Sequence, residues 1–208
     1  MTRSKKLSGS TDALDIRERL LQSALRIFTR KGYAATTVRE IVAEAGVAKP
    51  ALYYYFESKE GIYRVLIQRF MANMGSIMDS PPAPDGSVRE QLLQLADKIH
   101  DIAFQNRDAL RLMYGIYYGP PQGAPFFNFD DIHIDFFEYV REIVRQGIRS
   151  GELEPGRDDD MALLYIGATY GAIEDLICDH PIIIDRNQLK RIINLLFRGI
   201  ETKHEKAQ

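Results

Sequence analysis

Apolar residues recur every three to four positions along most of the chain, the spacing that places them on one face of a helix. The first such stretch begins at Leu14 and continues to Lys31, where Gly32 provides a common helix stop. Similar stretches follow between residues 87 and 200, separated by segments rich in proline and glycine. Strict alternation of apolar and polar residues, which would indicate strands, is not sustained. The pattern therefore predicts an all-α chain of about nine helices.

Two short helices joined by a glycine turn are predicted in the first third of the chain. Thr37 and Glu40 have the spacing of a capping box and open a helix over 38–45. Gly46 ends that helix, and a second short helix is predicted over 49–55. A longer helix followed by two short helices around a tight turn is the arrangement of a helix-turn-helix module.

The second short helix has side chains that suit contact with DNA. Leu52 and Phe56 are four residues apart, so they can share the side that is buried. Lys49 and Tyr53 share another side, where an ammonium group and a hydroxyl can contact phosphate oxygens and base edges. Ala51 is small enough to allow a close approach to the groove. The aromatic run alone would be typical of a core, but the neighbouring capping box and glycine turn favour a DNA surface.

The segment from Thr36 to Glu60 resembles the DNA-binding signature of the TetR family of transcriptional regulators, with the sequence TTVREIVAEAGVAKPALYYYFESKE. The preceding residues 24–33 resemble the first helix of that family and the glycine and aromatic residue at its end. The resemblance covers about residues 16–66. The rest of the chain agrees with the family only in length and helicity.

The resemblance implies a homodimer whose subunits each carry two domains. A flexible basic tail over 1–12 would precede a helix-turn-helix DNA-binding domain over 13–58. An effector-binding and dimerisation domain would follow over 59–208, beginning with a connecting helix over 59–78. The residues expected to contact DNA are Thr36, Thr37, Lys49, Pro50, Ala51, Tyr53, Tyr54 and Lys59.

The charge of the chain is distributed unevenly. Residues 1–69 carry 13 Lys and Arg against 7 Asp and Glu, whereas residues 70–208 carry 14 against 22. These parts have net charges of +6 and −8, although the whole chain carries only −2. A basic N-terminal part is consistent with an anionic partner such as double-stranded DNA.

Composition and motifs exclude several other classes of protein. The lone Cys178 has no partner for an intramolecular disulfide, and no apolar run reaches the roughly 18–20 residues of a membrane span. Without a secretory signal core, a cytoplasmic location is expected. No nucleophile elbow or glycine-rich phosphate loop indicates an enzyme. The histidines lack the spacing of metal ligands, so neither a metal nor a cofactor is predicted.

Aromatic residues gather between residues 100 and 140, together with tyrosine hydroxyls and two histidines. Aromatic residues at helical spacing are usually core, but an apolar pocket with a few polar groups is also the usual form of a small-molecule site. The resemblance implies such a pocket, and an apolar or aromatic effector is expected because this region has no cluster of Arg or Lys. The candidate lining residues are His100, Phe104, Tyr114, Tyr117, Tyr118, Phe127, His133, Phe136, Phe137 and Tyr165.

The last two helical stretches carry more apolar residues than one buried face requires. The resemblance implies that the equivalent helices form the dimer interface. The residues expected there are Tyr170, Ile173, Ile177, Leu189, Ile193 and Phe197.

The function expected from the sequence is a repressor that binds a palindromic operator and is released by its effector. The alternative is a dimeric helical carrier or sensor of small molecules whose DNA affinity is vestigial. Two departures from the family pattern support that alternative. Ala48 stands where many relatives have a hydroxyl cap, and Gly61 stands where a helix former is usual. The ratio of specific to non-specific DNA affinity distinguishes the two hypotheses.

Overall fold

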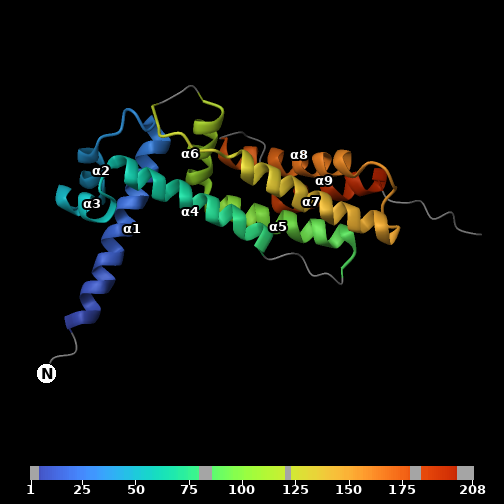
Figure 1. Cartoon of the computed structure of the whole chain (residues 1–208), viewed down its shortest axis with the longest axis horizontal. Coiled ribbons are helices and arrows are strands. Elements are labelled where there is room, and N and C mark those ends of the chain that lie inside the picture. Colours follow the sequence, from blue (N-terminus) through green and yellow to red (C-terminus); the bar gives the residue numbers. More distant parts are fainter. Residues whose placement is uncertain (1–4, 80–85, 120–122, 179–183, 201–208) are drawn as a thin grey trace, which may run out of the picture. The chain divides into compact units, whose positions relative to one another are not determined.

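The computed structural model describes residues 5–79, 86–119, 123–178 and 184–200 (Figure 1). These residues form helices and no strand, which confirms the all-α prediction. None of the described helices combines the length and the apolar character that a membrane span requires. The helices are α1 (Lys5–Lys31), α2 (Val38–Ala45), α3 (Lys49–Phe56), α4 (Lys59–Asp79), α5 (Val88–Gln105), α6 (Arg107–Tyr117), α7 (Asp130–Ser150), α8 (Asp158–Ile177) and α9 (Arg186–Ile200).

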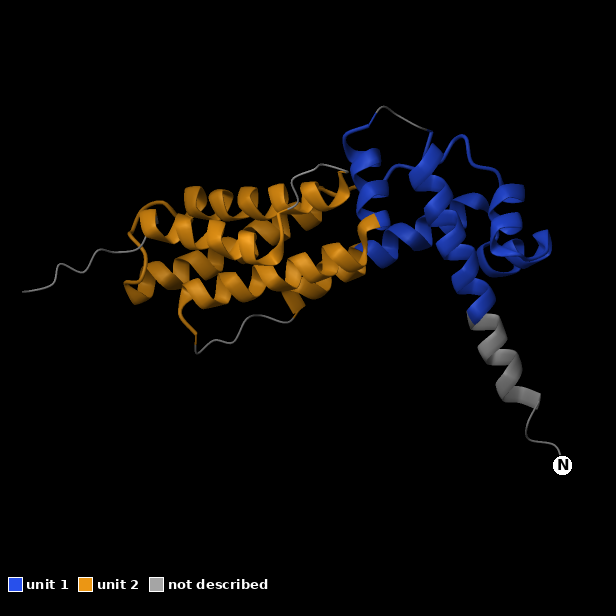
Figure 2. Ribbon diagram, turned by 180° about the vertical axis from the view of Figure 1, so that it is seen from behind, with its two compact units in different colours: residues 1–70, 108–127 blue, residues 71–107, 128–208 orange. Residues whose placement is uncertain are grey.

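The chain divides into two compact units (Figure 2). Unit 1 contains residues 1–70 and 108–127, and unit 2 contains residues 71–107 and 128–208. Helix α4 therefore contributes to both units, and nearly all of α6 belongs to unit 1. The functional boundary expected after residue 58 stays a prediction.

In unit 1, α1 packs against both α2 and α3. Arg19 of α1 reaches the end of α2, where its Nε donates to the Ala45 carbonyl at 3.1 Å and its Nη2 donates to the Gly46 carbonyl at 3.2 Å. These bonds satisfy carbonyl groups that the last turn of a helix leaves without an intrahelical partner. The core is formed by apolar side chains of four helices, Leu20, Ala24, Ile27, Phe28, Ile41, Leu52, Phe56, Ile62 and Ile67.

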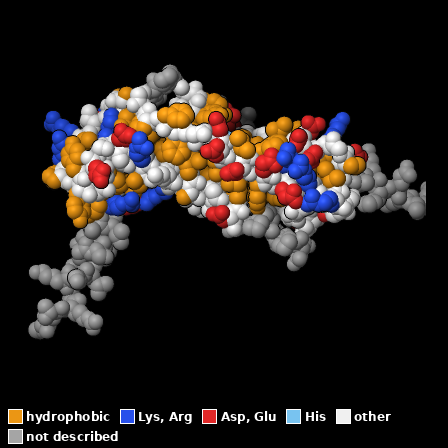
Figure 3. Space-filling model, in the orientation of Figure 1, with side chains coloured by type: hydrophobic (Ala, Val, Ile, Leu, Met, Phe, Trp, Pro, Cys, Tyr) orange, Lys and Arg blue, Asp and Glu red, His pale blue; other side chains and the backbone are white. Residues whose placement is uncertain are grey.

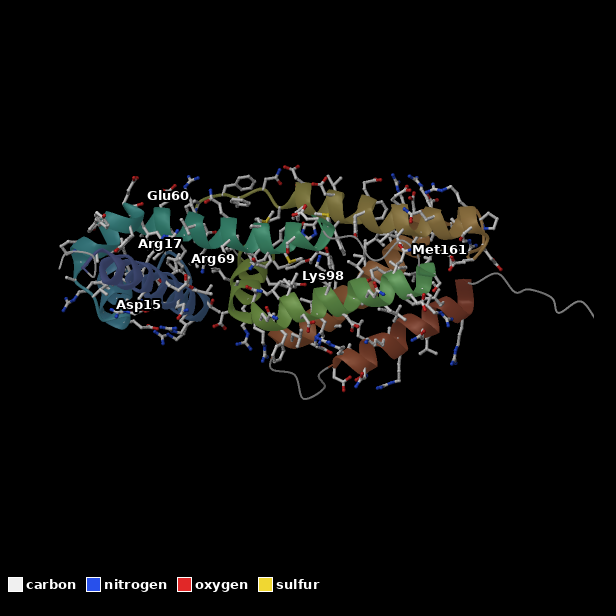
Figure 4. All side chains as sticks on the ribbon, turned by 90° about the horizontal axis from the view of Figure 1, so that it is seen from below. Asp15, Arg17, Glu60, Arg69, Lys98 and Met161 are labelled. Atoms are coloured by element: carbon white, nitrogen blue, oxygen red, sulfur yellow. The ribbon has the colours of Figure 1, made fainter. Side chains whose placement is uncertain are left out.

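In unit 2, α5 packs against α7, α8 and α9, and α8 also contacts α7 and α9. The start of α5 is a capping box formed by Ser87 and Glu90. Lys98 of α5, labelled in Figure 4, donates its ammonium to the carbonyls of Ser76 and Ile77 at 2.6 and 3.0 Å, which caps the end of α4. The core of this unit contains Leu92, Leu95, Ala96, Ile99, Val140, Val144, Ala162, Tyr165, Ala172 and Ile193.

The structure differs from the sequence expectation at the N-terminus. Helix α1 begins at Lys5, so residues 5–12 of the expected tail are helical, while residues 1–4 lie outside the described residues. No proline interrupts this stretch, so the helical pattern that is clear from Leu14 onward can extend toward the N-terminus. The expected flexibility of the tail stays a prediction.

A very tight turn joins α3 to α4 in unit 1. Glu57 has a positive φ of 64°, which is uncommon for a residue other than glycine. The Ser58 amide donates to the Phe56 carbonyl at 2.6 Å, so the chain reverses within three residues. A Cβ on Gly61 would lie only 1.9 Å from the Phe56 carbonyl oxygen. The absence of a side chain at Gly61 therefore allows the first turn of α4 to pack against the end of α3.

We expect Gly61→Ala to destabilise the protein by about 1–3 kcal/mol, because the added methyl group meets a backbone oxygen and the turn must shift. Gly75 is the matched control on the same helix, since a Cβ there meets nothing within 4 Å. Gly75→Ala should stabilise the protein by about 0.5–1 kcal/mol through helix propensity alone. Urea unfolding measures both changes, and effects of the same sign would contradict the tight turn.

Candidate nucleic-acid interface

The turn between α2 and α3 has the local geometry that its sequence predicts. Thr37 caps α2, because its side-chain oxygen accepts from the Glu40 amide at 3.3 Å. The Glu40 carboxylate in return accepts from the Thr37 amide at 2.9 Å, which completes the capping box. Gly46 follows α2 in the left-handed conformation, with φ 64°. The predicted bounds of α2 and its cap are confirmed.

An ion pair links this capping box to the end of α1. The Lys31 ammonium lies 2.5 Å from a Glu40 carboxylate oxygen. The bond from Lys31, followed by the bonds from the Thr37 hydroxyl and amide, lowers the pKa of Glu40 to about 2. The start of α2 is therefore held both by its own capping box and by Lys31 at the end of α1.

Helix α3 divides cleanly into a buried face and an exposed face. Leu52 and Phe56 are 0% and 4% exposed, as their spacing predicts. Tyr53 and Tyr54 are 45% and 81% exposed, although large aromatic side chains are usually buried. The Lys49 ammonium lies 5.7 Å from the centre of the Tyr53 ring. We call Lys49, Pro50, Tyr53 and Tyr54 the outer face of α3.

The N-terminus of α3 has no side-chain cap. Ala48 occupies the N-cap position in an extended conformation, and no side chain accepts a hydrogen bond there. The missing hydroxyl at Ala48 therefore leaves the start of α3 without a side-chain cap. Hydrophobic and basic side chains lie side by side at the part of unit 1 that carries α2 and α3 (Figure 3). A helix N-terminus beside basic side chains favours a negatively charged group such as a phosphate.

Thr36 and Lys59 have internal partners that the sequence did not indicate. Thr36 is 2% exposed, and its hydroxyl donates to the Gly32 carbonyl at 2.7 Å. The Lys59 ammonium donates to the carbonyls of Tyr33 and Thr36, each at 2.9 Å, and lies 4.2 Å from the centre of the Tyr33 ring. Burial, with a smaller effect of Lys31, lowers the pKa of Lys59. Thr36 thus shapes the loop and does not offer its hydroxyl to DNA, whereas a phosphate contact by Lys59 stays a prediction.

Two arginines of α1 also support the site and were not identified from the sequence. Arg17, labelled in Figure 4, places its guanidinium 5.3 Å from the centre of the Phe56 ring, and Arg19 caps α2 as described above. Arg69 of α4 forms two bonds of 2.9 Å with the carboxylate of Glu18. Charged residues on a helix surface carry no pattern that names a distant partner, so these contacts had no usable sequence signal.

The expected effector residues are divided between the two units. Tyr114, Tyr117, Tyr118 and Phe127 belong to unit 1, whereas His100, Phe104, His133, Phe136, Phe137 and Tyr165 belong to unit 2. In unit 2, the His133 Nδ1 lies 3.2 Å from the Tyr170 hydroxyl, and the Phe136 ring stacks on Tyr170 with centres 6.3 Å apart. His100 stacks on Phe104 at 6.5 Å, and burial is the main cause that lowers the pKa of His100.

Tyr165 is a core residue. It is 2% exposed, its hydroxyl donates to the Leu92 carbonyl at 2.9 Å, and burial raises its pKa well above the usual value. Its hydroxyl is therefore already used within the helix bundle. The remaining effector residues stay predictions.

Most of the residues expected at a dimer interface lie in the core of unit 2. Ile173, Ile177, Leu189, Ile193 and Phe197 are between 0% and 8% exposed, so they pack among helices of unit 2. The exposed leucines of the same two helices are Leu163, Leu164 and Leu195, at 57%, 52% and 60%. Burial of these residues within unit 2 leaves their place at a dimer interface a prediction that their packing does not favour.

The low pKa of Glu40 generates a prediction about acid stability. Its folded pKa lies below its usual value of 4.5, so the ion pair stabilises the protein above about pH 4.5 and is lost as the pH falls toward about 2. Glu40→Gln should therefore be less stable than the parent near neutral pH, and the difference should shrink toward pH 2. Urea unfolding at several pH values measures it, with Glu154→Gln on an exposed turn as the control. If the difference in unfolding free energy between the parent and Glu40→Gln did not change with pH, the low pKa assigned to Glu40 would be contradicted.

The sequence of this region matches a known protein family. Residues 20–66 match the family model described as bacterial regulatory proteins, tetR family. The regulator YvkB of Bacillus subtilis is 26% identical over 97 residues, which cover 47% of this chain and 50% of that protein. The repressor KstR2 of Mycolicibacterium smegmatis is 27% identical over 158 residues, which cover 74% of this chain and 75% of that protein. The chain spans about half the length, or less, of the first curated relatives that it matches.

Solved structures match the fold over nearly the whole chain. A TetR family transcriptional regulator from Chloroflexus aurantiacus J-10-FL superposes with a TM-score of 0.68 at 23% identity, covering 90% of this chain and 94% of that chain. KstR2 of Mycobacterium tuberculosis superposes with a TM-score of 0.65 at 21% identity, covering 90% and 95%. The segment over residues 20–66 therefore belongs by sequence to the TetR family of bacterial regulatory proteins, and the chain has the fold of solved TetR family regulators.

Proposed function

We propose that this chain is a transcriptional repressor that binds a palindromic operator as a homodimer and releases it when a small apolar or aromatic effector binds. The observation that carries the proposal is the outer face of α3. Lys49, Tyr53 and Tyr54 are exposed there, while Leu52 and Phe56 anchor the helix. An ammonium and two phenol groups on an anchored helix suit base edges and phosphates in a major groove. Because its target is chromosomal DNA, the protein acts in the cytoplasm.

Repression and release are the finer parts of this proposal. The relative KstR2 of Mycolicibacterium smegmatis is named a repressor, and it matches this chain over 158 residues. An effector releases DNA only to the extent that it binds the released form more tightly than the DNA-bound form. The carrier hypothesis loses one of its two supports, because the tight turn at Phe56 accounts for Gly61.

A selection from a pool of random duplexes tests the function directly. We expect an enriched palindrome whose binding constant falls steeply with salt, because the protein displaces counterions from phosphates. The selected sequence, placed upstream of a reporter, then tests repression. No enrichment, with only weak and salt-sensitive binding, would favour the carrier hypothesis.

Tyr53→Ala should weaken binding to the selected operator by about 1–3 kcal/mol, the size of a good base contact. Binding to random DNA should change little, because phosphate contacts dominate it. Tyr117→Ala on α6 is the matched control, since Tyr117 is 48% exposed and Tyr53 is 45% exposed. Fluorescence anisotropy with both duplexes measures the two affinities. Equal losses on operator and random DNA would remove Tyr53 from the set of base contacts.

Dimerisation is assigned in this proposal to the exposed leucines of α8 and α9. Leu163 and Leu164 project from α8 and Leu195 from α9, and a helix-turn-helix dimer requires two copies at a fixed spacing. On α8, Gly167 and Gly171 follow the leucines at helical spacing, and a Cβ on either would meet nothing within 4 Å. Small residues on an exposed helix face allow a second helix to approach closely.

Leu195→Glu should convert the dimer into a monomer of 23.8 kDa, because a carboxylate would be buried in an apolar interface. Ile134→Glu on α7 is the matched control, since Ile134 is 59% exposed and Leu195 is 60% exposed. Sedimentation at micromolar concentration measures the mass of each protein. A dimer that survives Leu195→Glu, or is lost with Ile134→Glu, would contradict the assignment.

A further inference from the structure

Unit 1 contains a cavity of about 280 Å³ between the end of α1 and one face of α6. Phe28, Lys31 and Tyr33 line it from the α1 side, and Arg111, Leu112 and Gly115 line it from α6. Ligand pockets in proteins occupy about 300–1,000 Å³, so this volume suits a molecule of one or two rings. None of the aromatic residues expected to bind an effector lines it. We call it the α1–α6 cavity.

The lining of the α1–α6 cavity combines apolar surfaces with positive charge. Phe28 and Leu112 are 1% and 6% exposed and offer apolar surface, and the Tyr33 ring adds an aromatic face. Arg30, Lys31 and Arg111 are basic, and no acidic side chain belongs to the described residues that line the cavity. Such a lining favours a ligand with a flat apolar ring and a negatively charged group.

The backbone oxygens near the cavity already accept hydrogen bonds. The Phe28 carbonyl accepts from the Gly32 amide at 2.9 Å, and the Gly32 carbonyl accepts from the Thr36 hydroxyl at 2.7 Å. The Tyr33 carbonyl accepts from Lys59. These three carbonyl oxygens are therefore used within the protein, and the charged side chains of the cavity lining are all basic.

The cavity has open space where α6 lacks a side chain. A Cβ on Gly115 would meet nothing within 4 Å, although Gly115 belongs to the cavity lining. After α6 the chain comes close to the loop that follows α1, since a Cβ on Gly123 would lie 3.9 Å from the Ala34 Cβ. A side chain added at Gly115 would therefore begin at the cavity lining with no other atom within 4 Å of its Cβ.

We propose that the α1–α6 cavity binds small aromatic monocarboxylates and that their binding weakens the contact with DNA. The carboxylate would lie among Arg30, Lys31 and Arg111, and the ring would lie against Phe28 and Leu112. Lys31 already pairs with Glu40 of the α2 capping box, so a bound carboxylate competes for the same ammonium. Tyr33, on the cavity wall, is held by Lys59 at the start of α4. The ligand thus contacts two residues that position the helix-turn-helix.

The test uses the full chain and 2-naphthoate, with uncharged 2-naphthamide as its neutral counterpart. The chain has no tryptophan, so the fluorescence of the naphthalene ring can be followed directly. We expect saturable binding of one 2-naphthoate per subunit and at least about tenfold weaker binding of the amide, because the amide lacks the charge-assisted bonds.

Gly115→Leu should abolish 2-naphthoate binding by filling the cavity, while Gly75→Leu in α4, where a Cβ also meets nothing within 4 Å, should leave it unchanged. Arg111→Gln should weaken the binding of 2-naphthoate and leave the binding of 2-naphthamide nearly unchanged. Helical circular dichroism confirms that each variant is folded. The proposed site would be contradicted if the parent and Gly115→Leu bound 2-naphthoate equally well. It would also be contradicted if the parent bound 2-naphthoate and 2-naphthamide equally well.

The coupling to DNA is measured separately from the binding. At saturating 2-naphthoate, we expect the operator affinity of the parent to fall at least about fivefold and that of Gly115→Leu to stay constant. Binding without any change in DNA affinity would support the site and overturn its coupling. This inference relies on the proposed function only for this second measurement. If the protein had no operator, the titration with 2-naphthoate would still decide whether the site exists.

Discussion

The arrangement of the DNA-binding unit depends on one partly buried cation. The Lys59 ammonium, at the first residue of α4, donates to two carbonyls of the loop that leads from α1 into α2, and it lies against the Tyr33 ring. Charged donors form the stronger class of hydrogen bonds, and burial makes their loss costly. The loop that carries the cap of α2 and the start of the helix that follows α3 are thereby fixed to each other. The outer face of α3 lies between these two fixed points in the chain.

Helices α1 and α4 contact different parts of α2 and α3. Arg17 and Arg19 of α1 contact the Phe56 ring and the end of α2, so α1 holds both short helices from one side. The Phe56 carbonyl and Gly61 are so close that α3 and α4 are joined with little freedom. The N-terminus of α3, by contrast, has no side-chain cap. The start of α3, which carries Lys49 and Pro50, therefore lacks the side-chain cap that the start of α2 has.

Local patterns in the sequence were sufficient to predict the helices, the capping box at Thr37 and the buried face of α3. Each of these depends on residues within four positions of one another. The roles of Lys59, Thr36 and Gly61 could not be predicted in this way, because their partners are fixed by tertiary packing or by an unusual turn. The burial of Ile173, Ile193 and Phe197 within unit 2 was also not evident from the sequence, because the spacing of apolar residues marks a buried face but not the partner that covers it.

The length of α4 has a mechanical consequence. This single helix of 21 residues begins in unit 1 and ends in unit 2, and a helix of that length extends about 31 Å. If one end acts as a pivot, a tilt of about 5° moves the other end by roughly 3 Å, given that length. That displacement is close to the rise of one base pair, about 3.4 Å. Because the tight turn at Glu57 joins α3 directly to α4, a small tilt of α4 is sufficient to displace α3 by about the spacing between two base pairs.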